Sequence, residues 1–331
     1  MLTPQDKHTS IYDSMLINYE VVYGKSVNRF PKHKYSIEEL VESFRACDGI
    51  IVGGRDKVPK AFMEQAPNLK VICKSSIGVE KIDVQAATEL GIMVTNAPIP
   101  HNYVAVAEGA ITLMLSVLKR VFELDAMTRK GLWRSYDVSP NLLYQKTIGL
   151  IGFGRIASSV VQRLAGWELD ILVYDPYVSD EQIHKTGAKS VSLDELFRQS
   201  DVVSVHVVLT PETFHLVNKE RLDLMKADSV IINTSRGEVI DEPYLFNCLQ
   251  NKRISGAGLD VFEEEPAPAT NPLFQLDNVI VTPHGISLAA ETLRQLTRTA
   301  IEECSLALEG SLPKYIVNPE VTDTWRNRSK P

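Results

Sequence analysis

Three side chains that together could reduce a carbonyl group follow short apolar segments of the 331-residue chain: Arg236, Glu265 and His284. Arg236 carries a planar fork of donors that suits a carboxylate and could polarise a neighbouring keto oxygen. His284 could donate a proton to that oxygen, because imidazole exchanges protons near neutral pH. Glu265 could hold the imidazole by a hydrogen bond and favour its protonated form. Taken singly, each residue also has a plain structural interpretation, as a solvated arginine, a surface acid and a helix cap.

The segments before these residues predict the ends of parallel strands. Apolar runs at 229–233, 256–260 and 279–282 precede the three residues in turn. Open α/β sheets bind ligands at the carboxyl ends of their strands, so residues that follow successive strands meet at one edge. Their joint placement therefore favours a site over the plain interpretation.

The whole chain alternates short β-branched runs with longer helical patterns, which predicts the α/β fold class with parallel sheets. Further strands are expected at 49–52, 70–73, 92–95, 147–152, 170–174 and 202–208. Helices are expected at 38–45, 156–165, 193–198, 220–225 and 242–251, with longer ones at 104–124 and 288–308. The polar tail 322–331 is expected to fray.

A glycine-rich turn joins a predicted strand to a predicted helix at residues 148–157. Gly152 permits a tight turn, Gly154 lets a pyrophosphate approach the backbone, and Ala157 lets the helix pack closely against the strand. The helix N-terminus, with Arg155 beside it, would then face the phosphates. This pattern predicts a dinucleotide-binding turn.

Asp175 ends the next predicted strand, 23 residues after Gly152. A carboxylate there accepts hydrogen bonds from ribose hydroxyls and repels a 2′-phosphate, which favours NAD over NADP. The alternative is a turn cap, because Asp175-Pro176 is common turn chemistry.

The two longest helical patterns predict where the chain passes between two domains. A Rossmann-type, doubly wound parallel-sheet NAD domain is expected at 103–289. A smaller, discontinuous, flavodoxin-like α/β substrate domain is expected at 1–102 and 290–331.

Composition argues against several classes of protein. Lys and Arg total 35 against 42 Asp and Glu, which disfavours a nucleic-acid binder. Residues 1–7 do not resemble a signal peptide, and the apolar stretch 104–118 is interrupted by Glu108, so a buried helix is expected rather than a membrane span. The four cysteines form no C-x-x-C pair, so neither disulfides nor a metal site is expected. We therefore expect a cytoplasmic protein.

Several ordered motifs, at 152–157, 201–206, 234–237, 258–266 and 282–284, resemble those of the D-isomer specific 2-hydroxyacid dehydrogenases. That family includes phosphoglycerate, D-lactate and glyoxylate/hydroxypyruvate dehydrogenases. The likeness runs from about residue 70 to residue 320. It implies NAD-dependent interconversion of a 2-oxo acid and a 2-hydroxy acid, with Arg236, Glu265 and His284 as the catalytic residues.

The resemblance implies binding residues as well. NAD contacts are implied for Gly152, Gly154, Arg155, Ile156, Asp175, His206, Thr210, Thr234, Arg236, Asp260 and His284. Substrate contacts are implied for Lys74, Ser76, Ile77, Gly78, Asn96, Arg236 and His284. Segment 74–83 resembles a loop whose backbone amides grip the substrate carboxylate. A homodimer joined through the NAD domain around 104–124 is also implied.

The chain departs from the family pattern at several places, including Val208, residues 285–287 and two positions that bear on the substrate. Lys74 stands where arginine is frequent, and lysine lacks the bidentate fork that suits a phosphate. His101 lies in an altered crossover and could approach the substrate, although a loop histidine is more often exposed. Two alternatives share the architecture: formate dehydrogenases, which have glutamine in place of Glu265, and NAD(H)-sensing co-repressors, which the motifs alone do not separate.

Overall fold

The computed structural model describes residues 17–24, 35–53, 56–134 and 138–328, so the segment 1–7 discussed above lies outside the described residues. Contacts divide the chain into two units. The central unit is Tyr103–Leu288, and the terminal unit is Met1–Asn102 with Ala289–Pro331.

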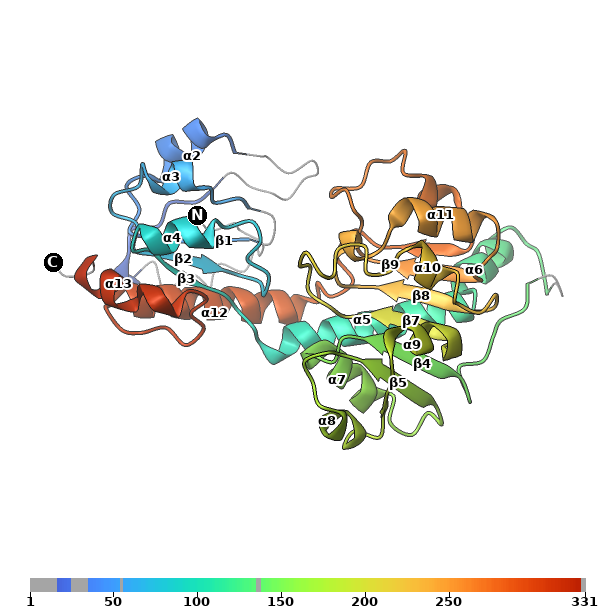
Figure 1. Cartoon of the computed structure of the whole chain (residues 1–331). Coiled ribbons are helices and arrows are strands. Elements are labelled where there is room, and N and C mark those ends of the chain that lie inside the picture. Colours follow the sequence, from blue (N-terminus) through green and yellow to red (C-terminus); the bar gives the residue numbers. More distant parts are fainter. Residues whose placement is uncertain (1–16, 25–34, 54–55, 135–137, 329–331) are drawn as a thin grey trace. The chain divides into compact units, whose positions relative to one another are not determined.

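In the described part of the central unit, seven strands form one parallel sheet (Figure 1). They are β4 (Thr147–Ile151), β5 (Asp170–Tyr174), β6 (Lys189–Ser190), β7 (Val202–Val205), β8 (Val230–Asn233), β9 (Gly256–Leu259) and β10 (Val279–Val281). Their spatial order is β10-β9-β8-β7-β4-β5-β6, with every neighbouring pair parallel. From β4 the strands are added outward in one direction up to β6, and from β7 they are added in the other direction. The boundary between β4 and β7 is the switch point at which such sheets bind ligands. The predicted doubly wound sheet is confirmed, and the short strand β6 was not predicted.

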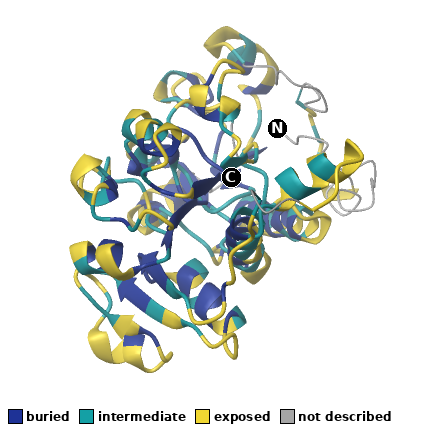
Figure 2. Ribbon diagram, turned by 90° about the vertical axis from the view of Figure 1, so that its right-hand side faces the viewer, coloured by how far each residue is buried: buried dark blue, intermediate teal, exposed yellow. Residues whose placement is uncertain are grey.

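Helices cover this sheet on both faces. They are α5 (Pro100–Leu118), α6 (Val121–Arg129), α7 (Arg155–Arg163), α8 (Asp180–His184), α9 (Leu193–Gln199), α10 (Lys219–Leu222) and α11 (Glu242–Gln250), with 3₁₀ turns η2 (Gly237–Val239) and η3 (Pro272–Gln275). Ile148 and Leu150 of β4 enter one core with α5 and α7, whereas Ile151 enters another with α9 and α11. This alternation follows from the two-residue period of a strand. The inner strands β4, β7, β8 and β9 are accordingly buried along most of their length (Figure 2).

The terminal unit contains a smaller parallel sheet. Its described strands are β1 (Gly49–Val52), β2 (Val71–Lys74) and β3 (Met93–Thr95), in the order β1-β2-β3. Its helices are α2 (Ile37–Phe44), α3 (Lys60–Met63), α4 (Val84–Glu89), α12 (Ala290–Leu308) and α13 (Thr322–Arg328), with the 3₁₀ turn η4 (Pro319–Val321). α12 packs against β1 and β2, so the C-terminal part of the chain completes the core of this unit.

One helix prediction is wrong in extent. The segment 104–124 was predicted as one helix, but α5 ends at Leu118 and α6 begins at Val121. Arg120 between them has φ 51°, a left-handed conformation that an α-helix cannot continue. Its guanidinium lies 2.6 Å from the Glu123 carboxylate, an ion pair across the first turn of α6. Because apolar periodicity runs on through the break, the pattern alone did not locate it.

The tail prediction is also wrong. Residues 322–328 were expected to fray, but they form α13. Trp325 is completely buried there, in the core with Met93 and Ile301. A single large apolar side chain in a polar segment is therefore enough to dock the helix.

α5 is, by length and composition, the one helix among the described residues that could cross a membrane. Ala107, Leu113 and Met114 of α5 are buried against the seven-stranded sheet. One face of α5 is thus buried in the core of the central unit.

Candidate active site

The turn after β8 fixes the backbone on both sides of Arg236. Asn233, the last residue of β8, accepts hydrogen bonds from the backbone N and the Oγ of Ser235, at 3.0 and 2.8 Å. Its Nδ2 donates to the carbonyl oxygen of Arg236 at 2.9 Å. Asparagine side chains commonly fold a turn in this way. Arg236 Nη1 in turn donates to the Ser235 carbonyl oxygen at 2.7 Å.

Gly237 brings this turn against the segment that follows β9. A Cβ atom at Gly237 would lie 1.9 Å from the carbonyl carbon of Phe262 and 2.4 Å from the backbone nitrogen of Glu263. Only glycine permits two backbones to approach so closely. Arg236 and Glu265 therefore belong to two loops in direct backbone contact.

Glu265 and His284 form a hydrogen-bonded pair. The Nδ1 atom of His284 lies 2.8 Å from Oε2 and 3.0 Å from Oε1 of Glu265. The His284 side chain is 38% exposed and the Glu265 side chain 28% exposed, so the pair is open to a ligand. With Nδ1 directed at the carboxylate, Nε2 is the ring nitrogen that could serve a reacting group.

Asp260 holds the segment that carries His284. Its Oδ1 accepts hydrogen bonds from Thr282 Oγ1 at 2.5 Å, from Gly285 N at 2.8 Å and from Ile286 N at 3.1 Å. Burial raises the pKa of the Asp260 carboxyl above its ordinary value, and these three donors oppose that rise. His284 itself has φ 50°, so these bonds stabilise a left-handed conformation that is uncommon for a residue with a side chain.

The glycine-rich turn has the geometry that a dinucleotide requires. Gly152 has φ 89°, and a Cβ there would lie 2.9 Å from the His206 carbonyl oxygen. A Cβ at Gly154 would meet nothing within 4 Å, so space is open at the start of α7. No side chain caps that helix, whose first residues are Arg155 and Ile156. Its first N–H groups are thus available to an anion.

Asp175 caps a turn and lies beside the glycine-rich turn. Its Oδ2 accepts from Phe153 N at 2.7 Å and its Oδ1 from Tyr177 N at 2.8 Å, so it does cap a turn. The same bonds place the carboxylate beside the glycine-rich turn. Each carboxylate oxygen has a further lone pair, which a ribose hydroxyl can use.

Two buried polar atoms lack a partner near the same edge of the sheet. They are Nδ1 of His206, after β7, and Oγ1 of Thr234, after β8. Burial lowers the pKa of His206 to about 4, so its imidazole is neutral at physiological pH. Buried polar atoms normally have partners, and their absence here fits a site built for a polar ligand. Thr210 lies in the loop after β7, where its backbone N donates to Thr213 Oγ1 at 2.7 Å.

The predicted substrate residues other than Arg236 and His284 lie in the terminal unit. Asn96 Nδ2 donates to the Ile77 carbonyl oxygen at 2.8 Å, Ala97 N donates to the Ser76 carbonyl oxygen at 3.0 Å, and Ser76 Oγ donates to the Gly78 carbonyl oxygen at 3.3 Å. These bonds draw three successive carbonyl groups inward. These bonds hold the backbone of residues 76–78 in one loop conformation.

Lys74 is buried in this unit, whereas His101 is exposed. Lys74 is only 1% exposed, and its Nζ donates to the Gly53 carbonyl oxygen at 2.5 Å. A substrate could reach this ammonium group only after the surrounding chain moves. His101 is exposed in the first turn of α5, where its carbonyl oxygen accepts from Thr292 Oγ1 at 3.4 Å.

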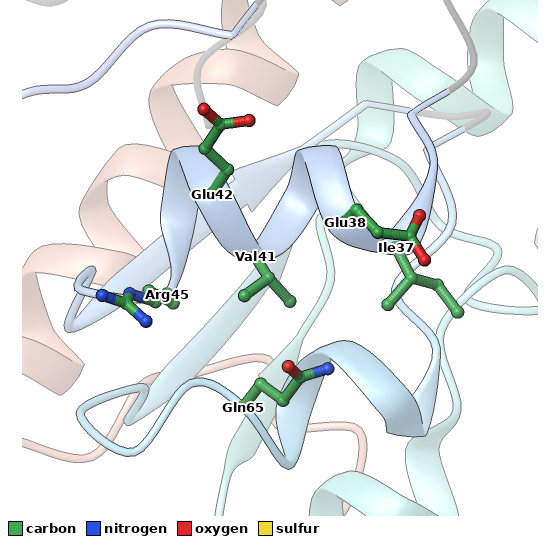
Figure 3. Close-up of a pocket in the computed structure, with 6 residues that line it drawn as sticks. All are labelled: Ile37, Glu38, Val41, Glu42, Arg45 and Gln65. Carbon is green, nitrogen blue, oxygen red and sulfur yellow. The ribbon is translucent and has the colours of Figure 1, made fainter.

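The described residues contain no metal-ligating cluster, and a surface pocket in the terminal unit is lined by other residues than the predicted site. No group of three or more metal-ligating side chains occurs among the described residues. A pocket of about 560 Å³ lies along α2, and Figure 3 shows Val41 and Gln65 facing each other across it while Glu42 points away. None of the predicted site residues lines this pocket.

The sequence alone did not single out Asn233, Gly237 or Gly109. Gly109 lies in α5, and a Cβ there would lie 2.7 Å from the Ile286 side chain, next to the His284 segment. The available signals were the glycine after Arg236 and the glycine within a predicted helix. Neither signal shows which distant segment packs against the glycine.

Comparisons with known proteins identify the family of this chain and relatives with a similar sequence. Residues 111–285 match the model of the D-isomer specific 2-hydroxyacid dehydrogenase family's NAD-binding domain. The chain is 38% identical over 296 residues to a D-3-phosphoglycerate dehydrogenase of Methanocaldococcus jannaschii, covering 89% of this chain and 56% of the relative. It is 40% identical over 291 residues to a glyoxylate reductase of Thermofilum pendens, covering 86% of each. This chain thus spans little more than half of the former relative and most of the latter.

A solved structure has a similar fold over nearly its full length. The D-lactate dehydrogenase of Aquifex aeolicus, complexed with NAD and lactic acid, matches with a TM-score of 0.81 and 29% identity. The match covers 95% of this chain and 97% of that one.

Proposed function

This chain belongs to the D-isomer specific 2-hydroxyacid dehydrogenase family, and we propose that it interconverts a short 2-oxo acid and the corresponding D-2-hydroxy acid with NAD. The observation that carries the proposal is the 2.8 Å contact between His284 and Glu265. Both residues belong to the same unit as the glycine-rich turn. The segment that leads to Glu265 is in backbone contact with the loop of Arg236.

The three side chains have complementary roles in this reaction. Bound NADH supplies the hydride that reaches the carbonyl carbon. Arg236 binds the substrate carboxylate and polarises the adjacent carbonyl oxygen. His284 donates a proton from Nε2 to that oxygen and accepts it back in the oxidation direction. Glu265 accepts a hydrogen bond from Nδ1, which keeps the ring oriented and stabilises its charged form.

The residues of the central unit fit NAD. The backbone around Gly152 and Gly154 and the N-terminus of α7, with Arg155 and Ile156, would bind the pyrophosphate. Asp175 would bind the adenosine ribose, and its negative charge disfavours NADP. The remaining predicted NAD contacts are His206, Thr210, Thr234 and Asp260. Two of these, His206 and Thr234, carry a buried polar atom without a partner in the protein.

In the terminal unit, the amides of Ser76, Ile77 and Gly78 would bind the substrate carboxylate. The inward-drawn carbonyl groups of this loop support that role. Lys74 is proposed to support the loop through Gly53 rather than to bind a phosphate directly. Glyoxylate, hydroxypyruvate and pyruvate are therefore better candidates than a phosphorylated acid.

A panel assay tests this function. Purified protein is mixed with NADH and with hydroxypyruvate, glyoxylate, pyruvate, phosphohydroxypyruvate or branched 2-oxo acids, and loss of NADH is followed by absorbance. We expect turnover with at least one unphosphorylated acid. Tight NADH binding without turnover on any acid would contradict the proposal and favour an NAD(H)-sensing protein. Glu265, where formate dehydrogenases have glutamine, disfavours formate oxidation.

We also propose that the protein is a cytoplasmic homodimer joined through the central unit. None of the nine residues of α6 is buried, and Phe122 on this helix is exposed. Trp133, shortly after it, is 77% exposed. The exposed apolar side chains of α6 and the exposed tryptophan next to it favour a protein interface. Light scattering should give twice the chain mass, and Phe122→Asp combined with Trp133→Asp should give the monomer mass; a wild-type monomer would contradict the dimer.

A further inference from the structure

Three consecutive acids, Glu263, Glu264 and Glu265, have different surroundings although their side chains are identical. Glu265 meets His284. Glu264 is exposed. Glu263 is half-buried and points to the other side of the segment, where its Oε1 lies 2.7 Å from Nε2 of His215.

Glu263 is also tied to the start of α11. Its Oε1 accepts a hydrogen bond from Glu242 N at 3.1 Å, and its own backbone N donates to Glu242 Oε2 at 3.0 Å. The other oxygen of Glu242 accepts from Asn271 Nδ2 at 2.8 Å. Glu242 thereby joins both ends of the segment 263–271, which contains Glu265.

His215 ties this segment to two other loops at the same edge of the sheet. It lies in the loop after β7, and its backbone N donates to the Glu238 carbonyl oxygen in the loop after β8, at 2.9 Å. Its ring stacks on Phe214, with centroids 4.1 Å apart. His215 has φ 47°, a left-handed conformation that directs its ring to Glu263. One residue thus contacts the three loops that carry Thr210, Arg236 and Glu265.

We propose that His215 and Glu263 are positioning residues, which hold the segment after β9 so that Glu265 meets His284. The expected loss of kcat rests on the proposed function. The contact between Glu265 and His284, which this inference explains, does not. Neither side chain touches the reacting groups. Both affect the reaction by fixing the position of Glu265, which lies two residues after Glu263 in the chain.

Activity measurements with matched variants test this proposal. Glu263→Ala removes both acceptor bonds, and we expect kcat to fall at least about 10-fold because catalytic groups tolerate little misplacement. The Kd for NADH should stay within about 3-fold, since the glycine-rich turn is untouched. Glu263→Gln keeps an acceptor oxygen and should restore most of kcat. Glu264→Ala is the matched control and should leave kcat unchanged.

His215→Asn is a second, independent variant. Asparagine adopts the left-handed conformation readily but is too short to reach Glu263. It should lower kcat as Glu263→Ala does while keeping the unfolding temperature close to that of the wild type. Unchanged kcat in a folded His215→Asn protein would overturn the proposal.

A double-mutant cycle tests whether Glu263 acts through Glu265. If it does, Glu263→Ala should lower kcat by less than about 2-fold when Glu265→Gln is already present. Multiplication of the two separate losses would show that Glu263 acts by another route and would overturn the proposal.

A readout without turnover separates this inference from the proposed function. In protein labelled with ¹⁵N-histidine, the ring resonances of His284 are assigned with His284→Ala. Glu263→Ala should shift them, whereas Glu264→Ala should not. Unmoved resonances in a folded Glu263→Ala protein would overturn the positioning role even if the wild type is active. If Glu263→Ala shifts these resonances but the wild type reduces no 2-oxo acid, the positioning role is supported and the proposed function is refuted.

Discussion

Replacing Gly237 by alanine should separate the loops that carry Arg236 and Glu265. The added Cβ would lie 1.9 Å from the Phe262 carbonyl carbon and 2.2 Å from its oxygen, where ordinary contacts begin at 3.4 Å. The obstacle is backbone, which cannot rotate away as a side chain can. The two loops must therefore move apart by about 1.5 Å, the difference between the contact limit and the shorter distance.

A shift of that size is large for a catalytic site. Misplacement of a reacting group by about 1 Å can cost roughly 100-fold in rate. We expect kcat/KM for the preferred 2-oxo acid to fall by about 100-fold in Gly237→Ala, which corresponds to about 2.7 kcal/mol of transition-state stabilisation. The crowding should also lower the free energy of unfolding by about 1–3 kcal/mol.

The assay compares initial rates of NADH oxidation with thermal unfolding and with the Kd for NADH. Gly285→Ala is the matched control, because its Cβ would lie 3.6 Å from the Leu288 side chain, an ordinary contact. That variant should keep kcat/KM within about 3-fold. A Gly237→Ala protein that retains more than one third of the wild-type kcat/KM would refute the reasoning that loop contact sets the site.

Three further outcomes follow from particular side chains. Burial lowers the pKa of His206 to about 4 from its ordinary value of 6.5, so acid favours the unfolded state below pH 6.5. Between pH 7 and pH 5 the free energy of unfolding of the ligand-free protein should fall by about 2 kcal/mol through this residue. Urea titrations of His206→Gln should lack that part of the loss. Trp325→Ala should lower the free energy of unfolding of the terminal unit by about 3–5 kcal/mol, because this side chain is completely buried; an unchanged unfolding temperature would show that α13 contributes nothing. Asp175→Ala should weaken NADH binding by about 10-fold and reduce the preference for NADH over NADPH, as calorimetric titration of both cofactors would measure.

The sheet of the central unit was predictable because its strands are buried on both faces. Runs such as Val202–Val205 and Val230–Asn233 are apolar at nearly every position, which distinguishes them from the amphipathic helices between them. The parallel direction of the strands follows from their regular alternation with helices, because parallel strands need crossover connections. The glycine-rich turn and Asp175 were predictable because their spacing is local.

What the sequence did not predict depends on contacts between distant segments or on single backbone angles. The break at Arg120 is a property of one φ angle. The docking of α13 depends on a core for Trp325 that other parts of the chain build. Gly237 is needed because of Phe262, and His215 meets Glu263, which lies 48 positions away in the sequence. Residue types show that such groups exist, but only the fold shows which of them meet.

The most direct test of the proton-transfer role is the single-turnover rate of NADH oxidation by wild type and His284→Ala with a saturating 2-oxo acid. The account predicts that removal of the imidazole slows this step by about 100- to 10,000-fold, while the Kd for NADH stays within about 3-fold. A His284→Ala protein that binds NADH and oxidises it at the wild-type rate would contradict the assignment.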